Sequence, residues 1–264
     1  MVGLKPTIDA IKIDRDILLA NKETLVVGGH LIKELLKEHL VKLYPIDSEH
    51  NAIWQILQGE EKPSIKRLII TASGGPFRDL TRKQLNNVTL QEALHHPNWS
   101  MGKKITIDSA TMMNKGLEII EACWLFDIPA CDIEVVIHPQ SIIHSLVEYI
   151  DGSSLSQLGK PDMRVPIAYA LGYPNRITSG IDGVLLDKLS GLEFFKPDLK
   201  KFRCLDLSYQ SLSMGAAHCI SLNASNEIAV EAFLLGRINF LQIPELIEKT
   251  LTKTVSSDVN SVDH

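Results

Sequence analysis

Apolar residues along the first 46 positions follow an alternation of helical and extended spacing. The spacing predicts a short helix over 7–13, a strand over 17–20, a helix over 24–38 and a strand over 41–46. Strands that alternate with helices in this way are typical of a parallel sheet. Two strands cannot form a stable doubly wound sheet alone, so we expect the chain to begin part-way through a Rossmann-like domain. Gly28-Gly29 lies inside the second helical pattern rather than after a strand, and is a poor match to a dinucleotide fingerprint.

From residue 47 the pattern becomes that of a mixed α+β domain. A helix over 51–57 and a helix that ends near His95 are expected on either side of a strand. Asp151-Gly152 is a strong hairpin turn, so we expect the sheet to be at least partly antiparallel. The segments with extended spacing are 67–72, 133–137, 145–150 and 154–158.

The last third of the chain predicts a linker followed by helices. Residues 172–200 are rich in Gly, Pro, Asn and Ser, and segments 205–221, 226–235 and 244–250 have helical spacing. The predicted fold class is therefore α/β and α+β. Its four parts are the remnant of a Rossmann-like parallel sheet (1–46), an α+β domain (47–171), a linker (172–200) and a C-terminal helical bundle expected to be truncated (201–264).

Composition narrows the class of protein without identifying it. Hydrophobic content of 45% and charged content of 22% are ordinary for a soluble globular protein. A net charge of −5 with scattered Lys and Arg argues against nucleic acid or a membrane as the main partner. The four cysteines form no C-x-x-C pair, and no apolar run approaches 18 residues. We therefore expect a cytoplasmic protein with reduced thiols.

The stretch I-D-S-A-T-M-M-N-K-G-L-E at 107–118 concentrates polar groups that can carry chemistry. A strand over 104–107 is expected to run into Asp108-Ser109, which are good N-cap residues, and a helix over 110–126 follows. Free N–H groups at the start of that helix, near Ser109, would form a site for an anion such as phosphate. A capped helix with a solvated polar stripe is the alternative interpretation.

Carboxylates on two segments could converge on a cation. On the predicted helix Asn114, Lys115 and Glu118 share one face. Asp47 and Glu49 are two residues apart in Asp47-Ser48-Glu49, so in extended chain they point the same way. Together with Glu118 they would supply three hard oxygen ligands, which suits Mg²⁺ or Mn²⁺. Asp47 and Ser48 could instead simply cap the following helix.

Three further segments are candidates for the walls of a binding site. Asn21-Lys22-Glu23 follows a strand of the parallel unit, where such folds bind ligands, although it could be a solvated helix start. Ser73-Gly74-Gly75 lets backbone approach a ligand, or forms a plain tight turn. In the loop 96–102, Trp99 suggests a lid over a substrate, with a Trp folded into the core as the alternative. For His138 and His144 a core or supporting role is expected rather than catalysis.

Taken together, these stretches resemble 1-deoxy-D-xylulose 5-phosphate reductoisomerases of the non-mevalonate isoprenoid pathway. The resemblance covers nearly the whole chain in family order. It rests on L-L-A-N-K-E (18–23), P-I-D-S-E-H-N-A-I (45–53), S-G-G-P-F-R (73–78), H-P-N-W-S-M-G-K-K (96–104), D-S-A-T-M-M-N-K-G-L-E (108–118), H-P-Q-S-I-I-H-S (138–145), G-K-P-D-M-R-V-P-I-A (159–168) and L-N-A-S-N-E-I-A-V-E-A-F (222–233).

The resemblance implies a role for individual residues. Those implied to bind the divalent metal are Asp47, Glu49 and Glu118. Those implied to contact the sugar phosphate are Lys22, Ser48, Glu49, Ser73, His96, Ser109, Asn114, Lys115 and Glu118, with Lys22, Glu49, His96 and Glu118 as the catalytic residues. Asn21, Glu23 and Gly102 match positions that touch NADPH.

The implied reaction is a metal-assisted skeletal rearrangement followed by reduction with NADPH, in a family that forms homodimers. Family members carry, ahead of this region, a glycine-rich turn that cradles the NADPH phosphates. We therefore expect this chain alone to bind metal and a phosphonate weakly and to oxidise NADPH at a negligible rate. The alternatives are a metal-dependent sugar-phosphate lyase or isomerase without a nicotinamide, and an inactive fragment that only binds a phosphorylated ligand.

Overall fold

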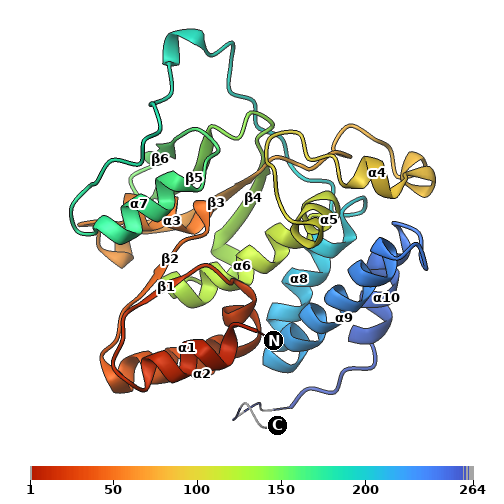
Figure 1. Cartoon of the computed structure of the whole chain (residues 1–264), viewed down its shortest axis with the longest axis horizontal. Helices are drawn as coiled ribbons and strands as arrows, with labels where there is room; N and C mark the ends of the chain where they lie inside the picture. The colour runs from red at the N-terminus through yellow and green to blue at the C-terminus, as the bar shows by residue number, and fades with distance from the viewer. Residues whose placement is uncertain (1, 258, 260, 262–264) are drawn as a thin grey trace.

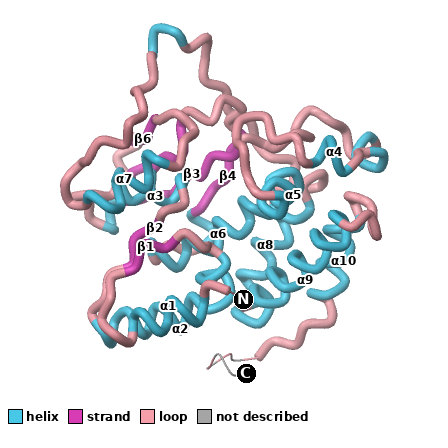
Figure 2. The backbone as a smooth tube through the Cα atoms, in the orientation of Figure 1, coloured by secondary structure: helices cyan, strands magenta, loops and turns pink. Residues whose placement is uncertain are grey.

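The computed structural model describes residues 2–257, 259 and 261. Figure 1 traces the chain and Figure 2 separates helices, strands and loops. The helices are α1 (Leu4–Ile11), α2 (Glu23–His39), α3 (Ser48–Ile56), α4 (Leu90–Ala93), α5 (Lys103–Thr111), α6 (Met113–Phe126), α7 (Arg164–Gly172), α8 (Arg203–Met214), α9 (Ala216–Leu234) and α10 (Gln242–Leu251). The strands are β1 (Ile17–Leu19), β2 (Leu43–Pro45), β3 (Ile65–Ala72), β4 (Ile133–Ile137), β5 (Ile143–Tyr149) and β6 (Ser154–Leu158).

The N-terminal segment folds as the predicted strand–helix–strand unit. β1 and β2 pair in parallel, with Leu18 opposite Tyr44, and α2 connects them. The first helix begins at Leu4, three residues earlier than predicted, because Pro6 is tolerated in a first turn. Gly28 and Gly29 lie inside α2, as expected, where Trp124 packs against Gly29.

The middle region holds a mixed four-stranded sheet in the order β4-β3-β5-β6. β3 pairs in parallel with β4 and antiparallel with β5, which confirms the expected partly antiparallel sheet. α3 packs across β5 and β6, while Ile119 of α6 joins the apolar cluster that includes Leu68 of β3. β2 and β3 therefore deliver the residues that follow them, Asp47 and Ser73, to the same region of the molecule.

The expected strand over 104–107 is wrong, because this segment is the first half of helix α5. Ile105 and Ile107 alternate with polar residues, which imitates strand spacing. In the structure Lys104 and Asp108 instead form an ion pair at helical i,i+4 spacing, 2.9 Å apart. The expected continuous helix over 110–126 is also divided, since Met112 adopts a left-handed conformation between α5 and α6.

The C-terminal helices form the predicted bundle, but its boundaries differ. The expected break between helices 205–221 and 226–235 is wrong, because α9 runs unbroken from Ala216, inside the first segment, to Leu234 in the second. The break falls at Gly215, whose φ of 100° favours glycine. Leu222 of α9 shares a hydrophobic cluster with Leu4 of α1, Val26 of α2 and Leu117 of α6. The bundle thus packs directly on the N-terminal unit and on α6.

Between β6 and the bundle, the chain forms helix α7 and then a long irregular segment. Helix α7 was not predicted from sequence. Residues 173–202 form the long loop at the top of Figure 1, tied to the sheet by an isolated bridge between Phe195 and Ile137. Within the described residues, no helix is long and apolar enough to span a membrane.

Candidate metal and phosphate site

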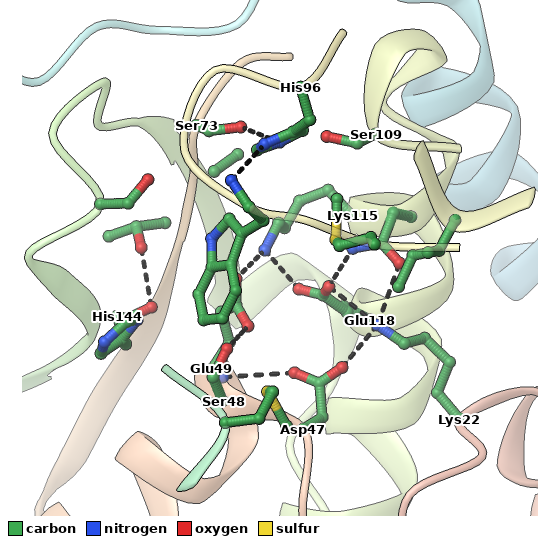
Figure 3. A pocket seen from close by; sticks show the side chains of 18 of the residues that line it. Lys22, Asp47, Ser48, Glu49, Ser73, His96, Ser109, Lys115, Glu118 and His144 are labelled. Atoms are coloured by element: carbon green, nitrogen blue, oxygen red, sulfur yellow. Dashed lines mark hydrogen bonds and ion pairs between the residues drawn. The ribbon is translucent and has the colours of Figure 1, made fainter. Parts of the chain in front are cut away.

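A cavity of about 280 Å³ opens where β2 and β3 end and where α6 begins. All ten residues that the resemblance assigned to metal or sugar phosphate line it, although they come from six separate segments. They are Lys22, Asp47, Ser48, Glu49, Ser73, His96, Ser109, Asn114, Lys115 and Glu118. Figure 3 labels all of them except Asn114 and shows the labelled side chains around one cavity.

Three carboxylates lie at the floor of this cavity. Asp47 is the N-cap of α3 and accepts a hydrogen bond from the backbone N–H of Glu49 at 3.2 Å. Glu118 projects from α6, and one oxygen from each of the three carboxylates lies within 4.8 Å of the others. The convergence was predicted, but not its cause: Glu49 belongs to the first turn of α3 rather than to extended chain. Three hard oxygen donors at this spacing fit a divalent cation such as Mg²⁺.

Two lysine ammonium groups lie among these carboxylates. Lys22 Nζ is 2.5 Å from Asp47 Oδ2 and 2.9 Å from Glu118 Oε1. Lys115 Nζ is 2.8 Å from Glu49 Oε1 and also contacts Glu118. Burial opposes a charged ammonium, but the surrounding carboxylates outweigh it and raise the pKa of both lysines. Both side chains are therefore cations held at the metal-ligand candidates.

The pKa values of two of these carboxyl groups, Glu118 and Asp47, are shifted in opposite directions. Burial and the nearby charge of Glu49 raise the pKa of Glu118, against the opposing effect of Lys115. Burial also acts to raise the pKa of Asp47, but Lys22 outweighs it and holds that pKa well below its usual value. A divalent cation would favour the ionised form of both groups.

His50 and Glu121 form a buried layer behind the carboxylates, and the sequence analysis assigned neither to the site. His50 Nδ1 lies 3.2 Å from Asp47 Oδ1 and 3.3 Å from Glu121 Oε2. Its Nε2 donates to the backbone oxygen of Glu118 at 2.8 Å. Although burial opposes the charge, Glu121 and Asp47 raise the pKa of His50 to about 9. The i,i+3 spacing from Asp47 to His50 and from Glu118 to Glu121 is the sequence signal for this layer.

The opposite side of the cavity has neutral hydrogen-bonding groups. His96 Nδ1 accepts from the backbone N–H groups of Asn98 and Trp99, at 3.2 and 2.9 Å. Burial and the charge of Arg78 lower the pKa of His96 to about 4. A neutral imidazole that accepts at Nδ1 carries its proton on Nε2, which lies 3.0 Å from Ser73 Oγ. His96 therefore presents a neutral donor beside Ser73.

The helix start that was predicted after Ser109 lies further along the chain, at Met113. Ser109 is in the last turn of α5, so the prediction that it caps a helix is wrong. The helix that begins at the cavity is α6, and its first turn contains Asn114 and Lys115. The Met113 N–H already donates to Thr111 Oγ1 at 3.3 Å, so the N–H groups of Asn114 and Lys115 are the candidates for the predicted anion site, which stays a prediction. Gly75 brings the Ser73 turn against α5, since a Cβ atom at Gly75 would lie 2.7 Å from the Ser109 backbone oxygen.

The loop 96–102 covers one side of the cavity. Trp99 and Met101 line the cavity together with Met163, which lies just before α7. Asn98 anchors the loop, because its Nδ2 donates to Pro139 O and to Ser141 Oγ, each at 2.7 Å. His144 lies behind the loop, with its ring centroid 6.4 Å from that of Trp99.

Asn21, Glu23 and Gly102, the residues expected to touch NADPH, lie beside the cavity rather than in its lining. The lining includes their neighbours Ala20, Lys22 and Met101. Glu23 begins α2 and Gly102 is the N-cap of α5, so the two lie at neighbouring helix starts joined by an ion pair from Glu23 to Lys104 at 2.7 Å. These residues fit one wall of a cofactor site.

A metal site next to a phosphate site, in a mixed α/β fold, is typical of enzymes that act on phosphorylated small molecules. Comparison with known proteins defines the family. Models described as 1-deoxy-D-xylulose 5-phosphate reductoisomerase and as its C-terminal domain match residues 1–29, 43–126 and 158–264. The reductoisomerase of Trichlorobacter lovleyi is 59% identical over 99% of this chain and 67% of its own length. That of Clostridium tetani is 54% identical over 100% of this chain and 68% of its own length.

Solved structures of reductoisomerases are also similar to this chain. A structure of DOX-P reductoisomerase in complex with NADPH, fosmidomycin and magnesium has a TM-score of 0.91 and 52% identity, over 94% of this chain and 64% of that one. The Zymomonas mobilis enzyme in complex with NADPH has a TM-score of 0.93 and 46% identity, over 99% of this chain and 68% of that one. The chain belongs to the 1-deoxy-D-xylulose 5-phosphate reductoisomerase family, and it spans about two thirds of the length of these relatives.

Proposed function

We propose that the chain carries the metal and substrate chemistry of a 1-deoxy-D-xylulose 5-phosphate reductoisomerase. The reaction is the NADPH-dependent rearrangement and reduction of 1-deoxy-D-xylulose 5-phosphate to 2-C-methyl-D-erythritol 4-phosphate in the non-mevalonate isoprenoid pathway. The observation that carries this proposal is the convergence of Asp47, Glu49 and Glu118 beside the start of α6. The two sites share one cavity, as a phosphorylated and metal-chelated substrate requires.

Each side of the cavity has a role in the proposal. Asp47, Glu49 and Glu118 would hold Mg²⁺ or Mn²⁺, which when bound supplies a Lewis acid for the carbonyl and neighbouring hydroxyl oxygens of the substrate. Lys22 would place a cation beside the same oxygens and counter the negative charge that develops on them. The phosphate-binding residues would be Ser73, Ser109, Asn114 and Lys115.

His96 and the loop that contains it would complete the site. The neutral Nε2–H of His96 can donate to the substrate without bringing a second positive charge. Trp99 and Met101 would exclude water from the rearranged aldehyde when the loop 96–102 closes. Asn21, Glu23 and Gly102 would face NADPH, whose hydride completes the reduction.

The metal assignment is tested by a single isosteric change. Glu118→Gln keeps the shape of the side chain but removes the charge, so Mn²⁺ affinity is expected to fall on the order of 10–100-fold. Calorimetric titration of Mn²⁺ into both proteins measures the change. Equal affinities in the two proteins would remove Glu118 from the ligand set.

The full reaction is tested by fusing this chain to the part of the Trichlorobacter lovleyi relative that it does not match. The chimera is expected to oxidise NADPH only when both substrate and Mg²⁺ are present, and Glu118→Gln is expected to abolish this activity. A chimera that consumes the substrate without oxidising NADPH would favour the metal-dependent lyase or isomerase. Binding of metal and phosphonate with no consumption of substrate would favour the inactive fragment.

We further propose a cytoplasmic location and a homodimeric assembly. All four cysteines are unpaired, which supports a reducing compartment. Large exposed apolar side chains concentrate between residues 150 and 199, which supports a protein partner for that face. The net charge of −5 supports small molecules rather than nucleic acid or a membrane as the remaining partners.

A further inference from the structure

A series of polar contacts leads from the C-terminal bundle to the start of α2 without entering the cavity. Asn226 on α9 donates from Nδ2 to Asp108 Oδ1 at 2.8 Å. Asp108 Oδ2 lies 2.9 Å from the ammonium of Lys104, one turn earlier on α5. The same ammonium donates to Glu23 Oε1 at 2.7 Å. Three helices that are far apart in sequence are thus connected side chain to side chain.

The part of this series of contacts that Asn226 and Asp108 form is fully buried, so the loss of either partner would be costly. Asn226 and Asp108 are 0% and 1% exposed. Burial raises the pKa of Asp108, while Lys104 and Asn226 act in the opposite direction. A buried carboxylate that loses a partner is destabilised strongly, so the position of Asp108 is fixed by both neighbours. Because Lys104 is bonded to Asp108, its ammonium has a defined position from which to hold Glu23.

The part of the series that Lys104 and Glu23 form sets the orientation of the Asn21 side chain. Glu23 uses Oε1 for Lys104 and accepts from Asn21 Nδ2 at Oε2, at 2.8 Å. Asn21 Oδ1 accepts from Thr24 Oγ1, also at 2.8 Å. Gly3 packs against the same amide, since a Cβ atom there would lie 2.4 Å from Asn21 Oδ1. The amide of Asn21 therefore has a single orientation, which depends on Glu23.

We propose that Asn226, Asp108 and Lys104 are positioning residues for the cofactor wall. They act through Glu23, which they hold in the orientation that fixes Asn21 next to NADPH. This proposal rests on the assignment of Asn21 and Glu23 to NADPH in the proposed function. It gives the bundle a part in cofactor binding, although Asn226 itself lies on α9 and touches neither ligand nor cavity.

The structure offers a matched control for Asn226. Asn223 lies one turn earlier on α9 and is 2% exposed, and among the described residues its side chain donates only to Glu227 of the same helix, at 3.2 Å. Asn226→Leu and Asn223→Leu therefore make the same chemical change in the same helix at nearly equal burial. Only the first of them removes a contact with α5.

The experiment measures the affinity of the full chain and its variants for NADPH by nicotinamide fluorescence. Asn226→Leu is expected to weaken NADPH binding about fivefold, the factor that corresponds to one hydrogen bond. Lys104→Met interrupts the same series of polar contacts at a half-buried position, so the proposal can still be tested if Asn226→Leu does not fold. Asn223→Leu is expected to leave the affinity unchanged. Equal affinities in all four proteins would overturn the proposal.

A second measurement separates this proposal from the proposed function. If the wild-type chain shows no binding of NADPH, the binding assay is repeated on the chimera with the Trichlorobacter lovleyi relative, and absence of binding there removes the assignment of Asn21 and Glu23 to the cofactor. Hydrogen exchange at residues 21–25 then tests, without NADPH, whether Asn226 and Lys104 hold Glu23 in position. Faster exchange in Asn226→Leu and Lys104→Met, but not in Asn223→Leu, supports the positioning of Glu23. Exchange at residues 21–25 that is unchanged in both variants would overturn it.

Discussion

Lys115 has two sets of possible partners, and a divalent cation would force a choice between them. Its ammonium contacts Glu49 and Glu118, two of the three proposed metal ligands. It also lies in the first turn of α6, among the proposed phosphate ligands. A cation bound to the carboxylates would repel the ammonium at short range. Lys115 would then be free to pair with phosphate, so metal and phosphate binding should favour one another.

The predicted consequence is that Lys115→Met binds Mn²⁺ more tightly than the wild type. Removal of one competing cation should raise Mn²⁺ affinity on the order of tenfold, since a nearby unit charge acts strongly at this low exposure. Affinity for propylphosphonate, which has no chelating group, should fall. Calorimetric titrations of both ligands provide the measurement.

Lys33→Met provides the control, because Lys33 pairs with Asp127 on the surface away from the site. It should change neither affinity. A weaker Mn²⁺ affinity in Lys115→Met would mean that the lysine supports the metal site instead of competing with the metal.

His50 makes the stability of the metal-free protein depend on pH. Its folded pKa of about 9 lies above the ordinary histidine value of 6.5. The folded chain therefore keeps a proton that the unfolded chain releases, and the resulting stability is complete below pH 6.5 and lost as pH rises through 9. Burial also raises the pKa of Glu121, to about 8, which acts in the same direction.

We expect the free energy of unfolding, measured with urea in the presence of EDTA, to fall by on the order of 1–3 kcal/mol between pH 6.5 and pH 9.5. His50→Gln should flatten this dependence whatever its stability at neutral pH. A slope that is equally steep in His50→Gln would assign the proton to another group.

At the residue scale, the sequence was sufficient to select the lining of the cavity but not to explain its geometry. Polar motifs at strand ends identified Asp47 and Ser73. The layer formed by His50 and Glu121 was missed, because Asp47 is a local partner of His50 but its second carboxylate partner, Glu121, lies 71 residues further along the sequence (121 − 50). Local spacing alone cannot report such contacts.

Among the elements, α5 shows most clearly why spacing can mislead. Ile105 and Ile107 imitate a strand, yet Ile107 is fully buried in a cluster with residues of α2 and α9. Packing on two sides removes the one-sided pattern by which a surface helix is recognised. The left-handed Met112 that ends α5 is equally unpredictable, since such a conformation is unusual for methionine.

The loop 96–102 should respond to ligand as a lid. A phosphonate-hydroxamate that mimics the substrate, added with Mn²⁺, is expected to change the fluorescence of Trp99 and to protect the loop from proteolysis, because Trp99 lines the cavity. Fluorescence titration and limited digestion give the two readouts.

Trp54 and Trp124 also emit, so the same titration is required on Trp99→Phe. The fluorescence change should disappear in this variant. A change that persists in Trp99→Phe would come from the other tryptophans and would remove the support for a lid.

Across the whole molecule, exposed apolar residues are unevenly distributed. Leu171 and Leu186 are each 65% exposed, and both belong to the region between residues 150 and 199. Ile150, Leu155, Ile177, Leu185, Phe194 and Phe195 are also exposed there. A surface of this kind is expected to be covered by a second copy of the chain.

Sedimentation velocity should therefore give a mass near twice 29.4 kDa for the wild type. Leu186→Asp should shift the protein toward monomer, because a charge would be buried in an apolar interface. Ile228→Asp is a matched control, since Ile228 is 67% exposed but lies on α9. A monomeric wild type, or equal effects of the two substitutions, would contradict the dimer at this face.

The division into four parts predicted from sequence says nothing of how these parts share a core. Leu4 and Leu251, near opposite ends of the described chain, belong to one hydrophobic cluster. Sequence patterns assign residues to elements and not to shared cores, which explains why the packing of α9 on α2 and α5 was not anticipated.

That shared cluster has a consequence for synthesis on the ribosome. The apolar face of α2 is made early, but its partner Leu222 emerges roughly 200 residues later, which at about 5–20 residues per second is a delay of roughly 10–40 s. During this interval α1 and α6 can already pack on α2, but the surface of α2 that α9 contacts stays exposed. Packing of this segment should therefore be complete only after α9 has been made, and until then the growing polypeptide is an expected client for chaperones.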